Sequence, residues 1–159
     1  TSATTIAPNG TTTRAQLVTM LYRQAGSPKA AKSSPFTDVT DSWSVDAINW
    51  AFEKGVVNGT SPTTFSPNDA ITRQDMATIL YNYTKNVLDL DVYDTADLTG
   101  YPDYSSISDY ARTPLSWAVA QGLILGVGNS NGVDTLQPKG DATRAQTATI
   151  IMRFCQNVL

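Results

Sequence analysis

The sequence predicts an all-α protein built from helical repeats. Within the 159 residues, a proline is followed six residues later by an arginine in a Thr-Arg step three times. Each copy leads into apolar residues at helical spacing, and a second helical segment containing Trp-Ala occurs twice. The pairs are Pro8 and Arg14, Pro67 and Arg73, and Pro138 and Arg144. Repetition of these motifs along the chain indicates small stacked units rather than one irregular domain.

The first expected helix follows Thr13 and runs to Gln24, where Gly26 and Pro28 end it. The other expected helices span 41 or 42 to 54, 72–85, 115–122 and 143–157. In the fourth of these, Pro114 stands where the earlier copy has Ala47. It either kinks the helix or occupies its first position after Thr113. Residues 127–135 are expected to form a longer loop.

The repeats divide the single domain 1–159 into a half repeat, 1–28, and two whole ones, 29–88 and 89–159. The half repeat has the arginine helix but lacks the Trp-Ala helix. We interpret the difference as a processing boundary, or as a place that a partner segment fills.

The amino-acid composition argues against several classes of function. A net charge of −3 argues against nucleic acid, which needs basic surfaces. No apolar run reaches the roughly 18–20 residues that cross a bilayer, so no membrane insertion is expected. The chain has no histidine, the commonest general base and a common metal ligand, and we expect no catalytic residue, metal or cofactor.

Two further features favour structural interpretations. The acidic connector at 87–100 invites a calcium interpretation, but position 12 of an EF-hand loop starting at Asp89 would be Gly100, so a solvated linker is expected. The single cysteine, Cys155, lies on the apolar side of the last helix and is expected to be buried.

Several motifs in fixed order, repeated along nearly the whole chain, resemble the S-layer homology (SLH) repeat. They are Phe36-Thr37-Asp38-Val39, Ala47-Ile48-x-Trp50-Ala51, Gly55-Val56-Val57-x-Gly59, Phe65-x-Pro67 and Ile71-Thr72-Arg73. The last repeat departs from the pattern at Pro114 and at Tyr101-Pro102-Asp103-Tyr104. The glutamate that ends the family signature is Gln16, Asp75 or Gln146 here.

The resemblance implies a pseudo-threefold, spindle-like helical bundle. It also implies a secreted module that anchors proteins to the bacterial cell wall through a secondary cell wall polysaccharide, often pyruvylated, held in grooves between repeats. The arginines that would grip a carboxylate of the ligand are Arg14, Arg73 and Arg144. The missing helix of the first repeat leaves at least one groove incomplete.

The residues themselves divide into structural and functional candidates. Thr13, Thr72 and Thr143 are expected to cap their helices, which explains them without a ligand. Arginine at the first helical position opposes the helix dipole by roughly 0.3–1 kcal/mol and therefore calls for a partner. That partner is either Asp38, Asp103 or loop carbonyls, or an anionic ligand held jointly by the guanidinium and the helix N-terminus.

Other candidates also have two interpretations. Trp50 and Trp117 are either core residues or platforms that stack on a sugar. Gly59 and Gly126 either adopt positive φ in a turn or let a ligand approach the backbone. Trp43 and Tyr110, at the starts of their helices, are expected to be more exposed.

The sequence is therefore compared with three functions that its motifs and composition bring into question: wall binding, protein interaction and catalysis. The leading one is a non-enzymatic wall-binding module. The alternative is a structural or protein–protein interaction module, completed by an upstream segment or a partner chain. A glycosidase with paired carboxylates is disfavoured, because the acidic residues lie in linkers and caps.

Overall fold

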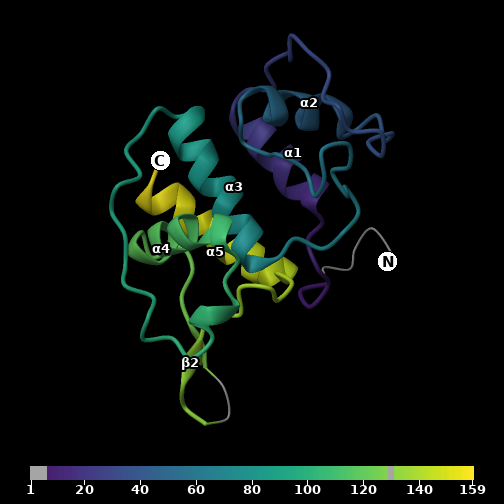
Figure 1. Ribbon diagram of the computed structural model, residues 1–159. Helices are drawn as coiled ribbons and strands as arrows, with labels where there is room; N and C mark the ends of the chain where they lie inside the picture. Colours follow the sequence, from purple (N-terminus) through teal and green to yellow (C-terminus); the bar gives the residue numbers. More distant parts are fainter. Residues whose placement is uncertain (1–6, 129–130) are drawn as a thin grey trace. The chain divides into compact units, whose positions relative to one another are not determined.

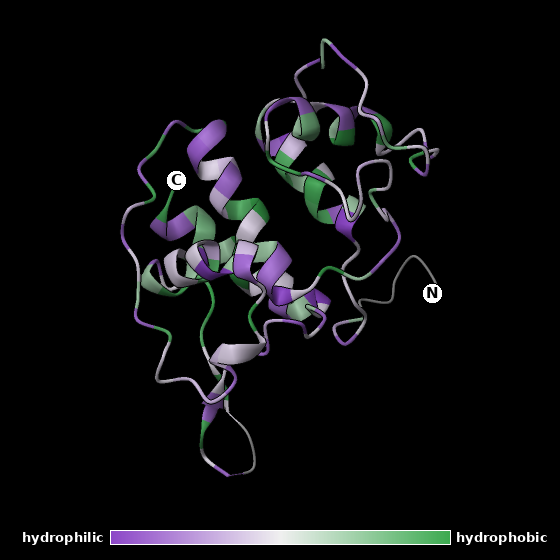
Figure 2. Ribbon diagram, in the orientation of Figure 1, coloured by the Kyte–Doolittle hydropathy of each residue, from purple (hydrophilic) through white to green (hydrophobic). Residues whose placement is uncertain are grey.

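The computed structural model describes residues 7–128 and 131–159 and confirms a predominantly helical fold (Figure 1). Its helices are α1 (Arg14–Gln24), α2 (Val45–Glu53), α3 (Arg73–Asn86), α4 (Arg112–Ala120) and α5 (Arg144–Asn157). Two short 3-10 helices, Tyr104–Ser106 and Asp109–Ala111, precede α4. Strands β1 (Val127–Gly128) and β2 (Asp134–Thr135) form one antiparallel pair. Figure 2 shows apolar and polar bands mixed along the helices, as amphipathic segments require.

Most predicted helix positions are confirmed, and the differences have local causes. Helix α2 begins at Val45, later than predicted, because the carbonyl of Asp41 accepts the N–H groups of both Ser44 and Val45 in a preceding turn. Pro114 is the third residue of α4, in its first turn, where the missing N–H has no intrahelical partner to lose. The prediction that it occupies the first helical position after Thr113 is therefore wrong. The expected loop at 127–135 contains the β1–β2 pair, with Val127 opposite Thr135.

The chain forms two compact units. One contains the described residues of Thr1–Thr12, Ile71–Thr78 and Tyr93–Leu159, and the other contains Thr13–Ala70 and Ile79–Val92. In the second unit α1 packs against α2, and the Trp50 ring lies between Tyr22 and Tyr83 at centroid distances of 5.5 and 6.3 Å. The largest buried side chains of the first unit include Ile71, Met76, Leu115, Trp117, Leu123 and Phe154.

A closed ring of three backbone hydrogen bonds lies in the first unit. Thr12 N–H donates to Ala142 O (3.1 Å), Ala142 N–H to Ile71 O (2.9 Å), and Ile71 N–H to Thr12 O (2.8 Å). Each of these residues comes immediately before a Thr-Arg step. The sequence repeat therefore appears in space as a threefold hydrogen-bond pattern.

The predicted threonine caps are confirmed. Thr13 and Thr143 each form a complete capping box, with Gln16 and Gln146 returning the hydrogen bond, and Asp75 N–H donates to Thr72 Oγ1 at 3.2 Å. The buried prediction for Cys155 is wrong, because its side of α5 is exposed. Within the described residues, no helix is long and apolar enough to cross a membrane.

Replacing Thr143 with alanine should lower the free energy of unfolding by about 0.5–2 kcal/mol, because the N–H of Gln146 loses its acceptor. Urea denaturation measures this change. Thr149→Ala, in the interior of the same helix, is the matched control and should change stability by less than about 0.5 kcal/mol. Equal losses in the two variants would show that the cap has no special role.

Candidate functional site

The N-terminal turns of the three arginine helices are built in the same way. The first two N–H groups of each helix donate to carbonyls of a proline loop from another repeat. Arg14 and Ala15 donate to Asp69 and Pro67, Arg73 and Gln74 to Gly140 and Pro138, and Arg144 and Ala145 to Gly10 and Pro8, at 2.7–3.1 Å. The third N–H of each helix donates to the capping threonine.

This arrangement corrects one expectation from the sequence. A helix N-terminus binds an anion through N–H groups that lack partners. Here the first three N–H groups of α1, α3 and α5 already meet protein oxygens. Any anion bound at these positions must therefore be held by the arginine side chain rather than jointly with the helix terminus.

Arg73 is the least exposed of the three signature arginines. Its Nε donates to Leu136 O at 2.8 Å and its Nη2 to Leu125 O at 2.9 Å, and the residue is only 4% exposed. Burial lowers the pKa of Arg73, and the nearby Asp103 carboxylate partly offsets that shift. The carbonyl interpretation of its partner is therefore confirmed, and the arginine joins the chain segments on either side of β1 and β2.

Arg14 repeats this geometry in the other unit. Its Nε donates to Phe65 O at 2.9 Å, its guanidinium carbon lies 5.0 Å from the centroid of the Phe65 ring, and it is 6% exposed. Phe65 and Leu136 hold equivalent places in their repeats, so the same type of carbonyl serves both arginines. Packing on an aromatic face adds a cation–π contribution at Arg14.

Arg144 differs from both, because it is exposed. The residue that corresponds to Phe65 and Leu136 in its proline loop is Ile6, which lies outside the described residues. Of the three signature arginines, Arg144 is the one that solvent and ligands can reach.

Asp38 and Asp103 accept hydrogen bonds from the loops that the buried arginines contact, and so hold these loops in place. The Asp38 carboxylate accepts the N–H groups of Phe65 (2.9 Å) and Ser66 (2.7 Å). Asp103 accepts those of Leu136 (3.0 Å) and Gln137 (2.7 Å). Ser66 and Gln137 both adopt positive φ, 57° and 49°, which turns two successive N–H groups toward one carboxylate. These aspartates therefore have structural partners in both repeats.

The tryptophans and glycines are also parts of the framework. Trp50 and Trp117 are each 1% exposed, so neither offers the open ring face that stacking on a sugar requires. Gly59 has φ +80°, as predicted, but Gly126 does not have positive φ, which corrects the turn interpretation. At Gly126 a Cβ would lie 2.6 Å from the Cβ of Asp134, so close packing against the hairpin is the constraint there.

Trp43 and Tyr110 are exposed, at 49% and 59%, as predicted. The sequence interpretation missed the role of Gln74, which is 4% exposed. Its side chain donates to Ser108 Oγ (3.0 Å) and accepts the N–H of Ser108 (3.0 Å). The signal was present in the sequence, because Gln74 replaces the alanine of the other two Thr-Arg steps.

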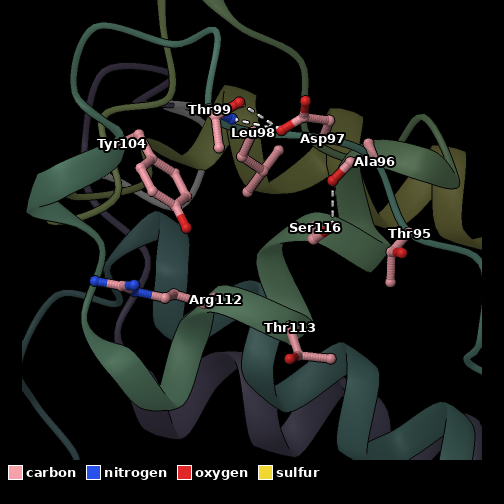
Figure 3. Close-up of a pocket in the computed structure, with 9 residues that line it drawn as sticks. All are labelled: Thr95, Ala96, Asp97, Leu98, Thr99, Tyr104, Arg112, Thr113 and Ser116. Atoms are coloured by element: carbon pink, nitrogen blue, oxygen red, sulfur yellow. Dashed lines mark hydrogen bonds between the residues drawn. The ribbon is translucent and has the colours of Figure 1, made fainter.

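A pocket of about 270 Å³ lies between the acidic connector and α4 in the first unit (Figure 3). The four aspartates of the connector are exposed, as predicted for a solvated linker, but the segment is also attached to the fold: Ala96 and Ser116 exchange two hydrogen bonds, and Leu98 is buried. Figure 3 shows Arg112 and Tyr104 on one side of the pocket and Asp97 on the other.

The groups lining this pocket suit a hydroxyl-rich ligand. Thr99 donates to the Asp97 carboxylate through its N–H (2.9 Å) and its hydroxyl (2.7 Å), and these bonds lower the pKa of Asp97. The Arg112 guanidinium lies 5.4 Å from the centroid of the Tyr104 ring and 3.3 Å from the Asp109 carboxylate. A carboxylate acceptor and a guanidinium donor can together bind hydroxyl groups.

Comparison with known proteins agrees with this architecture. The family model described as "S-layer homology domain" matches residues 35–77 and 100–148, more than half of the chain. The chain belongs to the S-layer homology family. The matched segments contain both complete Asp, Trp-Ala and arginine-helix patterns.

Three SLH relatives illustrate the range of proteins that contain similar segments. The chain is 38% identical over 154 residues to "Endoglucanase" of Bacillus sp. (strain KSM-635) and 33% over 152 residues to "Surface-layer 125 kDa protein" of Lysinibacillus sphaericus. It is 27% identical over 151 residues to "Cellulosome-anchoring protein" of Acetivibrio thermocellus. These matches cover 95%, 95% and 92% of this chain.

The same matches span only 15%, 12% and 32% of the three relatives. The relative with an enzyme name is thus similar to this chain over a small part of its length. Family membership, together with surface-layer and anchoring relatives, indicates a cell-surface anchoring role and a location at the cell wall.

Replacing Arg73 with alanine should lower the free energy of unfolding by about 2–4 kcal/mol, because two enclosed carbonyls lose their donors. Arg144→Ala, at the exposed counterpart, should change it by less than about 0.5 kcal/mol. Thermal and urea denaturation of both variants measure the contrast. Similar losses at the two positions would contradict the structural assignment of Arg73.

Acidification should destabilise the fold partly through Asp38. Partial burial raises the pKa of Asp38, but the N–H groups of Phe65, Ser66 and Asp38 itself, with the charge of Arg14, bring the net pKa below its ordinary value of 3.8. The unfolded chain therefore takes up this proton first. The stabilisation that the Asp38 carboxylate contributes is complete well above pH 4 and is lost as the pH falls below about 4.

The Asp38→Asn variant tests this linkage. In the acid range its free energy of unfolding should fall less steeply with decreasing pH, by at most about 1.4 kcal/mol per pH unit for one group. Asp94→Asn, which removes an exposed carboxylate from the connector, is the control. An unchanged slope in Asp38→Asn would show that this carboxylate does not contribute.

Proposed function

We propose that the chain is a non-catalytic module that anchors a surface protein to the bacterial cell wall by binding a secondary cell wall polysaccharide. The ligand group is a carboxylate on the polymer, such as a pyruvate ketal. The observation that carries the proposal is the exposure of Arg144 in a chain whose family anchors surface proteins. Guanidinium groups bind carboxylates through two parallel hydrogen bonds, which favours arginine for this task.

The geometry changes the relative importance of the three arginines for ligand binding. Arg14 and Arg73 hold loop carbonyls and are at most 6% exposed, so they position the loops around the site. Arg144 keeps an exposed guanidinium at an equivalent helix start. We therefore assign carboxylate recognition to Arg144, and loop positioning to Arg14 and Arg73 with their aspartates.

The pocket beside α4 gives the polymer a second point of contact. Its volume of about 270 Å³ lies just below the range of drug-sized sites and suits one sugar ring. Asp97 and Arg112 contribute opposite charges, so an uncharged ring with neighbouring hydroxyl groups fits better than a second anion.

The alternative function is an interaction module completed by another protein segment. One observation favours it: Met152 of the last helix is 52% exposed, and Leu159, just after that helix, is 51% exposed. The two functions are compatible, because wall binding is assigned to Arg144 and to the pocket beside α4.

Wall binding can be measured by sedimentation with purified cell wall sacculi, before and after chemical removal of the secondary polymer. The intact chain should bind only untreated sacculi. Arg144→Ala should weaken binding by about 10- to 100-fold, as expected for one charge-assisted pair, without loss of stability. Lys54→Ala, which removes the same charge from another exposed position, should bind normally.

Equal binding to stripped sacculi would refute the proposal, as would equal effects of Arg144→Ala and Lys54→Ala. The non-catalytic assignment has its own test. Release of soluble sugar from sacculi by the isolated chain would contradict it.

A further inference from the structure

A second pocket lies in the unit that contains α1 and α2, beneath the linker, residues 25–35, that leaves α1 toward α2. Its volume is about 330 Å³. It is lined by Tyr22 of α1, by Asp46 and Asn49 of α2, and by linker residues between 27 and 33. We call it the α2 pocket. It shares no lining residue with the pocket beside α4 and does not include Arg144.

Helix α2 fixes the linker over this pocket. Asn49 Oδ1 accepts the N–H of Ser34 at 2.8 Å. One turn further along, the Glu53 carboxylate accepts the N–H groups of Ala31 (2.6 Å) and Lys32 (3.3 Å). Hydrogen bonds from backbone donors to a carboxylate are among the stronger ones in proteins. The linker is therefore attached at three successive points and does not collapse into the space beneath it.

Helix α1 fixes the other end of the linker. The hydroxyl of Tyr22 donates to Ser27 O at 3.2 Å, and the N–H of Ser27 donates to Tyr22 O at 2.9 Å. The ring of Tyr22 lies 5.5 Å from the ring of the buried Trp50. The pocket wall that Tyr22 forms is thus positioned by the core of the unit.

The pocket beside α4 occupies the equivalent place in the next repeat (Figure 3). In each repeat the same two positions of the Trp-Ala helix line the pocket, four residues and one residue before the tryptophan: Asp46 and Asn49 in α2, Thr113 and Ser116 in α4. The later position also binds the incoming chain in both repeats. Asn49 accepts from Ser34 N–H, and Ser116 donates to Ala96 O. The chain therefore builds the same type of pocket twice.

The two pockets differ in charge. The ionisable groups that line the α2 pocket are Lys29, Lys32 and Asp46, which leave one net positive charge. Those of the pocket beside α4 are Asp97 and Arg112, which cancel. Neither lysine forms an ion pair with a described residue. A net positive pocket in a chain of net charge −3 indicates a ligand with a negative group.

We propose that the α2 pocket binds an acidic sugar, a ring that bears a carboxylate or a phosphate group. The ammonium groups of Lys29 and Lys32 attract either anion, because lysine acts as a point charge without the geometric preference of arginine. The amide of Asn49 and the hydroxyl of Ser33 hydrogen-bond to ring hydroxyl groups, and the half-buried Tyr22 ring packs against the ring's C–H groups.

The size of the pocket agrees with a single ring. Its volume of about 330 Å³ lies at the lower end of the roughly 300–1,000 Å³ of small-molecule sites. This site is additional to the carboxylate recognition assigned to Arg144 and does not rest on it.

The backbone N–H signals of residues 29–33 in nitrogen-15 NMR spectra report on this pocket. The probes are glucuronate, glucose 6-phosphate and, as the uncharged control, glucose. An acidic sugar should shift these signals saturably with a Kd on the order of 1 mM, and glucose should bind at least about tenfold more weakly. A response to glucuronate alone supports a carboxylate ligand, and a response to glucose 6-phosphate alone supports a phosphate ligand.

Three variants test the role of charge. The double variant Lys29→Gln/Lys32→Gln should weaken binding of the acidic sugar at least about tenfold. Asp46→Asn should strengthen it about two- to fivefold, because a like charge leaves the pocket. Lys54→Gln, which removes a positive charge outside the pocket, should leave the Kd unchanged. All four side chains are exposed, so each variant should keep the unfolding midpoint of the intact chain.

The absence of saturable shifts at residues 29–33 with both acidic sugars would overturn the proposal. Equal shifts with glucose, or equal affinities of the double lysine variant and Lys54→Gln, would also overturn it. Arg144→Ala should bind the acidic sugar at the α2 pocket as the intact chain does. Sacculus binding through Arg144 and sugar binding at the α2 pocket are therefore measured separately, and either proposal can fail without the other.

Discussion

The fold depends on backbone hydrogen bonds between helix starts and proline loops that are distant in sequence. Each arginine helix gives its first two N–H groups to carbonyls of another repeat's loop. In the first unit, the ring of Thr12, Ile71 and Ala142 closes the same pattern. Because helix N-terminal donors need partners, each repeat completes the next one, and no single repeat satisfies its own backbone.

This constraint explains why two of the three signature arginines are buried. Once the N–H groups of the helix start are used, the guanidinium is placed beside the adjoining loop and donates to Phe65 O or Leu136 O. An aspartate on the other side of the loop holds its N–H groups. The arginine thus donates to a carbonyl of the loop, while the aspartate accepts N–H groups of the same loop. The hydrogen bonds of the arginine offset the unfavourable position of a cation at a helix N-terminus.

The functional proposal rests on the one signature arginine that is exposed. Arg14 and Arg73 hold loop carbonyls and are at most 6% exposed, whereas Arg144 is exposed at an equivalent helix start. Carboxylate recognition is therefore assigned to Arg144, while the complete repeats serve mainly as framework.

The sequence alone determined the helical class, the repeats, the caps at Thr13, Thr72 and Thr143, and the family, because these follow from local spacing and hydrogen-bonding chemistry. It could not decide whether Arg73 or Arg144 faces solvent, since their local sequences are nearly alike and only the partner loop differs. It also placed Cys155 on an apolar face but could not show that the face is uncovered. Burial depends on which distant segment packs against a residue, and that was decided by the tertiary structure.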